Sequence, residues 1–210
     1  MFKSIQLKKD QSIWITSDTH FGHINLIKNL SKWKDKSGCR NFDSIEDHDN
    51  TIIDNINNLV KKTDILYHLG DWSFGDIDNI KKYRNRINCK DIRLVLGNHD
   101  KYIEPKDSPY RGCFTSVDWI DGFSIKKEDM PFKVKFYLSH CAHRVWFNNH
   151  HGSISLFAHS HGSLLPKEWG RSMDVGLDTN NFYPYHLDEI IYFMKDIELL
   201  VLDHHNIETT

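Results

Sequence analysis

Short apolar segments rich in β-branched residues recur along the chain, and polar residues follow each of them. Segments of this length and composition are typical of buried or half-buried β-strands. The sequence predicts strands at residues 12–16, 64–69, 91–96, 133–138 and 153–158.

Two of the stretches between these strands, and one after them, have helical spacing. Over residues 44–62 the aliphatic side chains fall on one side of a helix, and Ser44 is suited to be its N-cap. Similar spacing predicts helices over 74–88 and 184–200. Strands and helices that alternate early in the chain, with further strands later, indicate an α/β layered fold.

Length and charge add constraints on the class of protein. A chain of 210 residues predicts a single domain over 1–210, and its formal charge of −2 disfavours a strongly basic nucleic-acid binder. The basic run 81–90 fits the outer face of a helix better than a nucleic-acid footprint. Four scattered cysteines form no CxxC pair, which indicates neither a structural zinc site nor a disulfide framework. Without a leader or an apolar run of membrane-spanning length, we expect a cytoplasmic protein.

Polar side chains with ligand chemistry stand directly after five of the predicted strands. These strand ends read SDTH (17–20), GD (70–71), GNHD (97–100), SH (139–140) and HSH (159–161). Ligand sites of α/β sheets form at the carboxyl ends of the strands. We therefore expect the five ends to converge on one rim.

The residues at this rim form a mixed set of oxygen and nitrogen ligands, which suits manganese, iron, zinc or nickel. His159 and His161 are two residues apart, so both side chains can lie on one face of an extended segment. The candidate ligands exceed the coordination shell of one ion, which predicts a two-metal site bridged by Asp71. They are Asp18, His20, Asp71, Asn98, His140, His159 and His161.

Five motifs of the chain occur in the order and approximate spacing of the motifs of one protein family. They are SDTHFGH, HLGDWSFG, LVLGNHD, LSH and FAHSHG. They resemble the D-x-H, G-D, G-N-H-[DE], H and G-H-x-H motifs of the calcineurin-like metallophosphoesterases. When residues 140–153 are included, the chain resembles a subgroup of small stand-alone phosphoesterases from bacteria and phages. The resemblance implies a four-layer α/β/β/α sandwich of two mixed β-sheets flanked by helices. Ala158 departs from the family glycine, which argues against a positive φ there.

The resemblance also implies how the ligands divide between two divalent metal ions, with manganese the first choice. Asp18, His20, Asp71 and His161 would hold the first ion, and Asp71, Asn98, His140 and His159 the second. Such a pair clamps a phosphate and makes a bridging hydroxide available for in-line attack. The expected catalytic residues are Asp71, His99 as general acid, and Asp100, which would orient His99 or a metal ligand.

Further residues are candidates for substrate binding, each with a plainer alternative. Arg144 suits a phosphate but also a surface salt bridge. His23 could reach the phosphate or a metal ligand, or cap a helix at the surface. For the others, packing or loop anchoring is the alternative. The full set is Asn98, His99, Arg144, His23, His143, Trp146 and His151.

Three further features are left open between two interpretations. His68, inside a predicted strand, is expected to be a core residue or to support a metal ligand. Asp174 and Asp178 are expected to be scaffold residues that can approach the site through a hydrogen bond. The segment 31–44 is either a lid over the site or a surface excursion, and packing of Trp33 and Phe42 would distinguish these.

These expectations favour a dinuclear-metal phosphoesterase that acts on a phosphomonoester or phosphodiester, with a small phosphorylated or nucleotide-type substrate. A nuclease or nucleic-acid end-processing phosphatase is the alternative with the same chemistry, although the acidic charge disfavours long nucleic acid. A non-catalytic, metal-bound interaction scaffold is the alternative of another class. The oligomeric state stays open.

Overall fold

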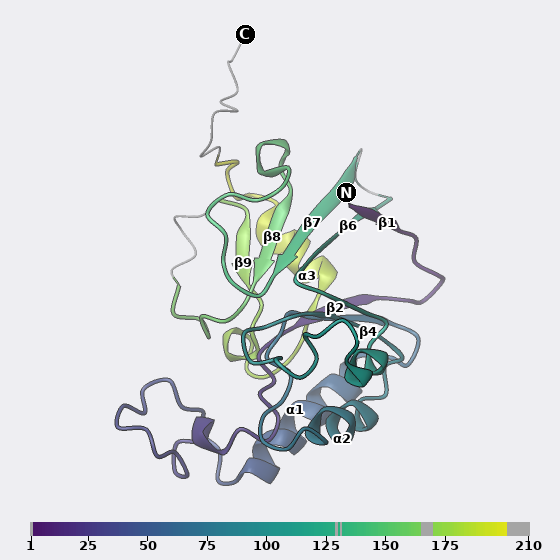
Figure 1. Cartoon of the computed structure of the whole chain (residues 1–210). Coiled ribbons are helices and arrows are strands. Elements are labelled where there is room, and N and C mark those ends of the chain that lie inside the picture. Colours follow the sequence, from purple (N-terminus) through teal and green to yellow (C-terminus); the bar gives the residue numbers. More distant parts are fainter. Residues whose placement is uncertain (1, 129, 131, 165–169, 201–210) are drawn as a thin grey trace.

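The structure is a computed structural model that describes residues 2–128, 130, 132–164 and 170–200, and its described strands form two sheets (Figure 1). The first sheet contains, in spatial order, β1 (Lys3–Ile5), β6 (Ile120–Lys126), β7 (Lys133–Ser139), β8 (Ile154–Phe157) and β9 (Ser172–Asp174). The second contains β10 (Tyr185–His186), β2 (Ile13–Thr16), β3 (Ile65–His68), β4 (Asp91–Val95) and β5 (Ser116–Asp118). The α-helices are α1 (Ile45–Leu59), α2 (Asn79–Arg86) and α3 (Leu187–Met194).

Both sheets are mixed, but the strands that precede the predicted site residues pair in parallel. In the second sheet β2, β3, β4 and β5 run parallel and only β10 is antiparallel to its neighbour. In the first sheet β7, β8 and β9 run parallel, whereas β6 and β7 are antiparallel. The carboxyl ends of β2, β3 and β4 therefore share one sheet edge, as do those of β7 and β8.

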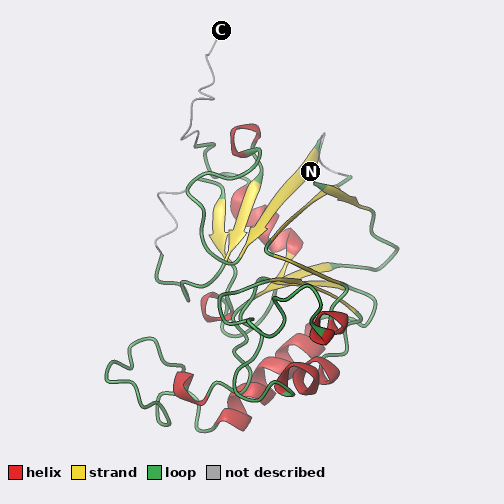
Figure 2. Ribbon diagram, in the orientation of Figure 1, coloured by secondary structure: helices red, strands yellow, loops and turns green. Residues whose placement is uncertain are grey.

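Alternate side chains of one strand pack into two different apolar clusters, as the two-residue period of a strand requires. Ile65 and Tyr67 of β3 point between the sheets, where the Tyr67 ring stacks on Phe123 of β6 at 5.0 Å. Leu66 points the other way and packs with Ile56 of α1. Figure 2 shows α1 and α2 covering that outer side of the second sheet, while α3 contributes to the cluster between the sheets. The predicted α/β fold of two mixed sheets with helices is confirmed, with α1 and α2 on the outer side of the second sheet.

The first helix begins where its sequence predicts. The Ser44 side chain accepts a hydrogen bond from the Asp47 amide, so Ser44 is the N-cap, and the acidic first turn suits the helix dipole. Ile52, Ile53 and Ile56 form the buried stripe of α1.

The other two predicted helices are shorter than their sequence spacing indicates. The helix predicted over 74–88 begins only at Asn79, whose side chain donates to the Phe74 carbonyl oxygen at 2.6 Å and holds a turn at residues 74–78. The helix predicted over 184–200 spans Leu187–Met194, since Tyr185 and His186 pair with β2. Tertiary hydrogen bonds therefore override helical spacing at both boundaries.

The apolar runs of the sequence did not predict β1, β5, β6, β9 or β10. Four of these strands have three residues or fewer, too short to show a two-residue period. β6 has seven residues, with Asp121, Gly122 and Ser124 interrupting its apolar side chains. Its position depends on pairing with β7 over Ile120 to Lys126 rather than on local composition.

Candidate metal centre

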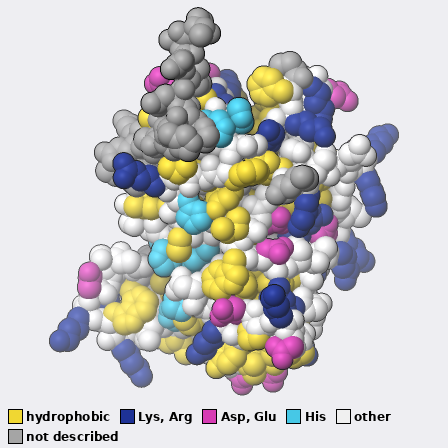
Figure 3. Space-filling model, turned by 45° about the horizontal axis from the view of Figure 1, so that its top comes forward, with side chains coloured by type: hydrophobic (Ala, Val, Ile, Leu, Met, Phe, Trp, Pro, Cys, Tyr) yellow, Lys and Arg dark blue, Asp and Glu magenta, His cyan; other side chains and the backbone are white. Residues whose placement is uncertain are grey.

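The strand ends converge as the sequence predicts, and each predicted ligand stands in a turn after a strand. Asp18 and His20 follow β2, and Asp71 follows β3. His140 directly follows β7, and His159 lies two residues beyond β8. On the face drawn in Figure 3, histidine side chains gather in a band between hydrophobic side chains.

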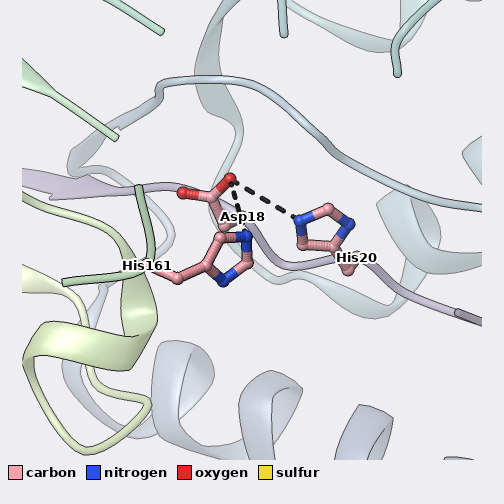
Figure 4. Close-up of side chains that lie close together, drawn as sticks. All are labelled: Asp18, His20 and His161. Atoms are coloured by element: carbon pink, nitrogen blue, oxygen red, sulfur yellow. Dashed lines mark ion pairs between the residues drawn. The ribbon is translucent and has the colours of Figure 1, made fainter. Parts of the chain in front are cut away.

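A first cluster brings together Asp18, His20 and His161, whose ligand atoms all lie within 4.8 Å of one another. Asp18 Oδ1 is 3.6 Å from His20 Nε2 and 3.9 Å from His161 Nε2. Figure 4 shows both imidazole rings directed at this one carboxylate. The cluster joins two chain segments that are more than a hundred residues apart.

A second cluster brings together Asp71, His140 and His159 within the same limit. Asp71 Oδ2 lies 3.5 Å from His140 Nε2 and 3.7 Å from His20 Nε2 of the first cluster. Asn98 Oδ1 is 3.0 Å from His140 Nε2, so the amide reaches this cluster too. One carboxylate therefore faces both clusters, which is the arrangement expected of a bridging ligand.

The chemistry of the first cluster fits a cation. Among the buried side-chain atoms without a hydrogen-bond partner are Asp18 Oδ1 and both ring nitrogens of His20. A buried polar atom without a partner costs about 1–3 kcal/mol, and a metal ion that accepts its lone pair removes that cost. Carboxylate oxygen and imidazole nitrogen are the ligands that zinc, manganese and iron accept.

The neighbours of the two carboxylates keep them ionised, which is the form that binds a cation. Burial favours the neutral acid, but the hydrogen bond with His140 and the nearby His20 hold the pKa of Asp71 well below its ordinary value. Burial is likewise outweighed at Asp18, where His20 and His161 lower the pKa. Burial lowers the pKa of His20 and so favours the neutral imidazole, the form that ligates a metal.

The turns that carry the ligands have unusual backbone conformations. Positive φ angles occur at Asp18 (55°), His20 (46°), Asp71 (57°), His159 (65°) and His161 (48°). This left-handed conformation costs a non-glycine residue about 1–2 kcal/mol, and such strain is concentrated at functional sites. Packing around the turns therefore has to hold the ligands in place.

Close approach of two turns explains the glycine before Asn98. A Cβ on Gly97 would lie 2.2 Å from Asp71 Oδ1, inside van der Waals contact, so a side chain there would displace the carboxylate. Ala158, by contrast, is not among the described residues with positive φ, which confirms that no positive φ is required at this departure from the family motif.

Asp100 is a positioning residue rather than a group that faces the clusters. It is 3% exposed, and its carboxylate accepts hydrogen bonds from the backbone N–H groups of Asp71, Trp72 and Gly97 at 2.8–3.0 Å. Burial raises its pKa to about 6. The carboxylate thus ties the Asp71 turn to the Asn98 turn, which agrees with the interpretation that Asp100 orients a metal ligand, and its catalytic role stays a prediction.

His68 and Asp174 support the turns that carry the ligands. This agrees with one of the two interpretations given above for each residue. The His68 ring is fully buried, contacts Thr19 Oγ1 at 2.9 Å and accepts from the Gly70 amide, and burial lowers its pKa to about 3. Asp174 accepts from the Ser160 hydroxyl and the Gly162 amide. It therefore holds the turn that carries His159 and His161.

Sequence reasoning missed Arg40, which is buried. Its guanidinium pairs with Asp178, whose carboxylate lies 2.7 Å from His161 Nδ1. Asp178 therefore does approach the site through a hydrogen bond. No local signal marks Arg40, because it stands in a polar segment where an arginine is normally solvated.

The remaining candidates separate into residues near the clusters and residues away from them. His99 is exposed, and its backbone N–H donates to Asp71 Oδ1 at 2.9 Å. His23 lies near the first cluster, with ring centroids 5.5 Å from His20. Arg144 is exposed, on the segment that follows His140.

Three residues of the 140–153 segment take part in local packing. Trp146 is 5% exposed and its indole N–H donates to Ser153, which agrees with the loop-anchoring alternative. His143 shares a 2.6 Å hydrogen bond with the Tyr137 hydroxyl. His151 lines a cavity with Met194 whose described walls include no cluster residue, and its role in substrate binding stays a prediction.

Comparison with protein families agrees with this geometry. The model of the calcineurin-like phosphoesterase family matches residues 11–205, and both clusters lie inside that range. The chain belongs to the calcineurin-like phosphoesterase family. It is therefore a metal-dependent phosphoesterase.

Relatives of the phosphoesterase come from an archaeon and from phages. An uncharacterized protein of Methanocaldococcus jannaschii is 30% identical over 88% of this chain and 92% of its own length. The gene 66 protein of Mycobacterium phage D29 is 27% identical over 89% of this chain and 98% of its own length. The crystal structure of a protein of unknown function from Aquifex aeolicus has a TM-score of 0.58 at 19% identity, covering 88% of this chain and all of that one, and shows the same fold.

No described helix of the phosphoesterase has both the length and the apolar character of a membrane span.

Metal binding should stabilise the phosphoesterase measurably. A cation at 100 times its Kd contributes about 2.7 kcal/mol per site. For a chain of this size that raises Tm by about 5–10 °C. We expect this shift when Mn²⁺ is added to protein from which metal has been removed with the chelator EDTA. Differential scanning fluorimetry measures the two Tm values. An identical Tm with EDTA and with saturating Mn²⁺, Zn²⁺, Ni²⁺ and Fe²⁺ would argue against the metal centre.

Proposed function

We propose that the protein is a dinuclear phosphoesterase in which Asp71 bridges two divalent cations. Asp18, His20 and His161 complete the first ligand set, and Asn98, His140 and His159 complete the second. The observation that carries the proposal is the position of Asp71 Oδ2, within 3.7 Å of a histidine nitrogen in each cluster. The mixed oxygen and nitrogen ligands suit manganese first, with iron, zinc or nickel as substitutes.

Each part of the site has a separate task in this proposal. When bound, a cation pair neutralises phosphoryl oxygens and makes hydroxide available near neutral pH. His99 donates a proton to the departing oxygen, because its backbone is held against Asp71 while its ring stays exposed to a substrate. Asp100 keeps the Asp71 and Asn98 turns in register through its backbone hydrogen bonds.

A wall of aromatic rings beside the first cluster supports a nucleotide-type substrate. Its members are Trp33, His23, Phe74 and His99. The His23 and Phe74 rings stack at 3.8 Å, Trp33 stands edge-on to His23 at 5.7 Å, and Phe74 lies 4.6 Å from His99. The Phe74 ring is also 5.1 Å from His20. A nucleobase has a π-face that stacks on such rings without requiring a particular base.

Trp33 offers an exposed position at which to test this aromatic wall, since 43% of it is accessible to solvent. Stacking of one base contributes about 1–3 kcal/mol, so Trp33→Ala should raise KM for a mononucleotide substrate about tenfold. KM for bis-p-nitrophenyl phosphate should change less. Tyr192→Ala is the control, because Tyr192 is an exposed aromatic residue of α3 (64%) whose ring contacts Phe193 and Lys195 rather than the aromatic wall. Equal KM values for Trp33→Ala and wild type on every nucleotide would contradict the stacking role.

A substrate panel tests the function as a whole. With Mn²⁺, the protein should hydrolyse bis-p-nitrophenyl phosphate or p-nitrophenyl phosphate, and then mononucleotides or cyclic nucleotides in preference to oligonucleotides. Faster turnover of oligonucleotides would favour the nuclease or end-processing alternative. A protein inert toward all of them with every divalent metal would count against the proposed chemistry.

A further inference from the structure

Arg40 is buried to an extent that few arginines are, since only 3% of it is exposed. A buried guanidinium requires partners for its N–H groups. Its Nε and one terminal nitrogen donate to the two carboxylate oxygens of Asp178 at 2.8 and 2.7 Å. Such a two-pronged pair fixes orientation as well as charge.

The Arg40–Asp178 pair ends on a candidate metal ligand. Asp178 Oδ2 lies 2.7 Å from His161 Nδ1, which leaves Nε2 of the same ring on the side of Asp18, 3.9 Å from its Oδ1. A carboxylate on one imidazole nitrogen fixes the tautomer and ring direction for a metal on the other nitrogen. Arg40 therefore acts on His161 through Asp178.

The same guanidinium also holds the other half of the first cluster. It donates to the carbonyl oxygen of Asp18 at 2.6 Å and to that of Thr19 at 3.4 Å. Asp18 and His20 flank Thr19 and both have positive φ, so these hydrogen bonds support a strained turn. Arg40 thus contacts both segments that supply the first cluster.

A second row of buried groups supports Arg40 from behind. Its remaining N–H donates to His48 Nε2 at 2.9 Å, and the opposite ring nitrogen contacts Asp49 Oδ1 at 2.8 Å. Burial lowers the pKa of His48, which favours the neutral ring that this arrangement needs. Asp49 in turn accepts from the Tyr83 hydroxyl of α2 at 2.5 Å.

Arg40 comes from the segment 31–44, whose residues 32–38 are exposed and project from the body in Figure 1. The Arg40 backbone pairs with Leu26 and Lys28, which fixes the base of the segment. Phe42 packs against His48. We propose that Arg40 is a positioning residue for the first metal, so that segment 31–44 is a structural part of the metal site. This proposal rests on the proposed dinuclear centre.

Arg40→Met tests the proposal, because it keeps an unbranched side chain and removes every N–H donor. Loss of such outer contacts weakens metal binding about 10–100-fold. We expect that loss for the first metal only, with the second metal bound as in wild type. Isothermal titration with Mn²⁺ measures both affinities without substrate. Electron paramagnetic resonance should show a coupled manganese pair in wild type and a single-ion signal in the variant at limiting Mn²⁺. Anomalous scattering from Mn²⁺-soaked crystals assigns the weakened site.

Two further variants and a matched control separate positioning from general stability. Asp178→Asn removes the charge between Arg40 and His161 and should weaken the same metal. Arg40→Lys keeps the charge and should restore part of the affinity. Arg93→Met is the control, because Arg93 forms a similar two-pronged pair with Asp91 away from the clusters. It should bind both metals as wild type does.

The results distinguish this proposal from the proposed function. Wild-type affinity for both metals in Arg40→Met, or in Asp178→Asn if Arg40→Met does not fold, would overturn the positioning role. Equal weakening of both metals in a folded variant would also overturn it. A wild-type protein that binds no metal would instead refute the dinuclear centre itself.

Discussion

Replacing Asp71 by asparagine should abolish turnover and weaken both metal ions together. Asp71 Oδ2 faces His20 in one cluster and His140 in the other, while Oδ1 accepts the His99 amide. An amide keeps the volume but loses the charge that both cations would share. Because loss of one electrostatic contact to the reacting group already costs about 10²–10³-fold, we expect kcat to fall at least about 10³-fold. Metal analysis after dialysis should show that neither ion is retained stoichiometrically.

Asp91→Asn provides the control for this substitution. Asp91 begins β4, at the opposite end of the strand from Asn98, and pairs with Arg93. This variant should keep the wild-type metal content and rate. Two tightly bound ions in Asp71→Asn would contradict the bridging assignment, whatever the activity.

Replacing His99 by alanine should leave the metals bound and remove most turnover of substrates with poor leaving groups. The His99 ring belongs to neither metal cluster, and its contact with Asp71 is made by the backbone, which alanine keeps. General acid catalysis contributes about 10²–10⁴-fold. The loss should be largest for an alkyl phosphate, whose alkoxide needs a proton, and smallest for a p-nitrophenyl ester, whose phenolate is a stable anion.

The comparison of leaving groups is the internal control for His99. Metal content and Tm should match those of the wild type. A loss of activity on all substrates that came from damage to the metal centre would therefore be recognised. An equal fall in rate for alkyl and p-nitrophenyl esters, with both metals present, would assign His99 to binding rather than to proton transfer. An unchanged rate with the alkyl ester would exclude the general-acid role.

The candidate ligands were predictable because each stands next to a strand that its own neighbours define. An apolar run such as residues 12–16 fixes where β2 ends, and the following Asp18 and His20 are then placed at the sheet edge. The start of α1 was predictable for the same reason, since Ser44 and the residues after it make the cap locally. Motifs and periodicity report only on residues that are close together along the chain.

The boundaries of α2 and α3 depend on tertiary contacts, which the periodicity of the sequence does not reveal. Asn79 begins α2 because its side chain bonds the Phe74 carbonyl oxygen, and β10 replaces the first turn of a predicted helix because β2 offers an edge. The sequence likewise leaves Trp146 open between a pocket residue and a loop anchor, whereas its burial and its hydrogen bond to Ser153 favour the anchor.

By itself the sequence determined which residues are candidate metal ligands and at which sheet edges they stand. Only the tertiary structure decided how that site is held together. Arg40 and Asp178 are separated by 138 residues, yet they form the link to His161. An arginine in a polar segment is normally solvated, and its burial follows from chain packing rather than from its neighbours. Local patterns have periods of about two or four residues, so they encode strand ends and helix faces but carry no signal for a contact of that range.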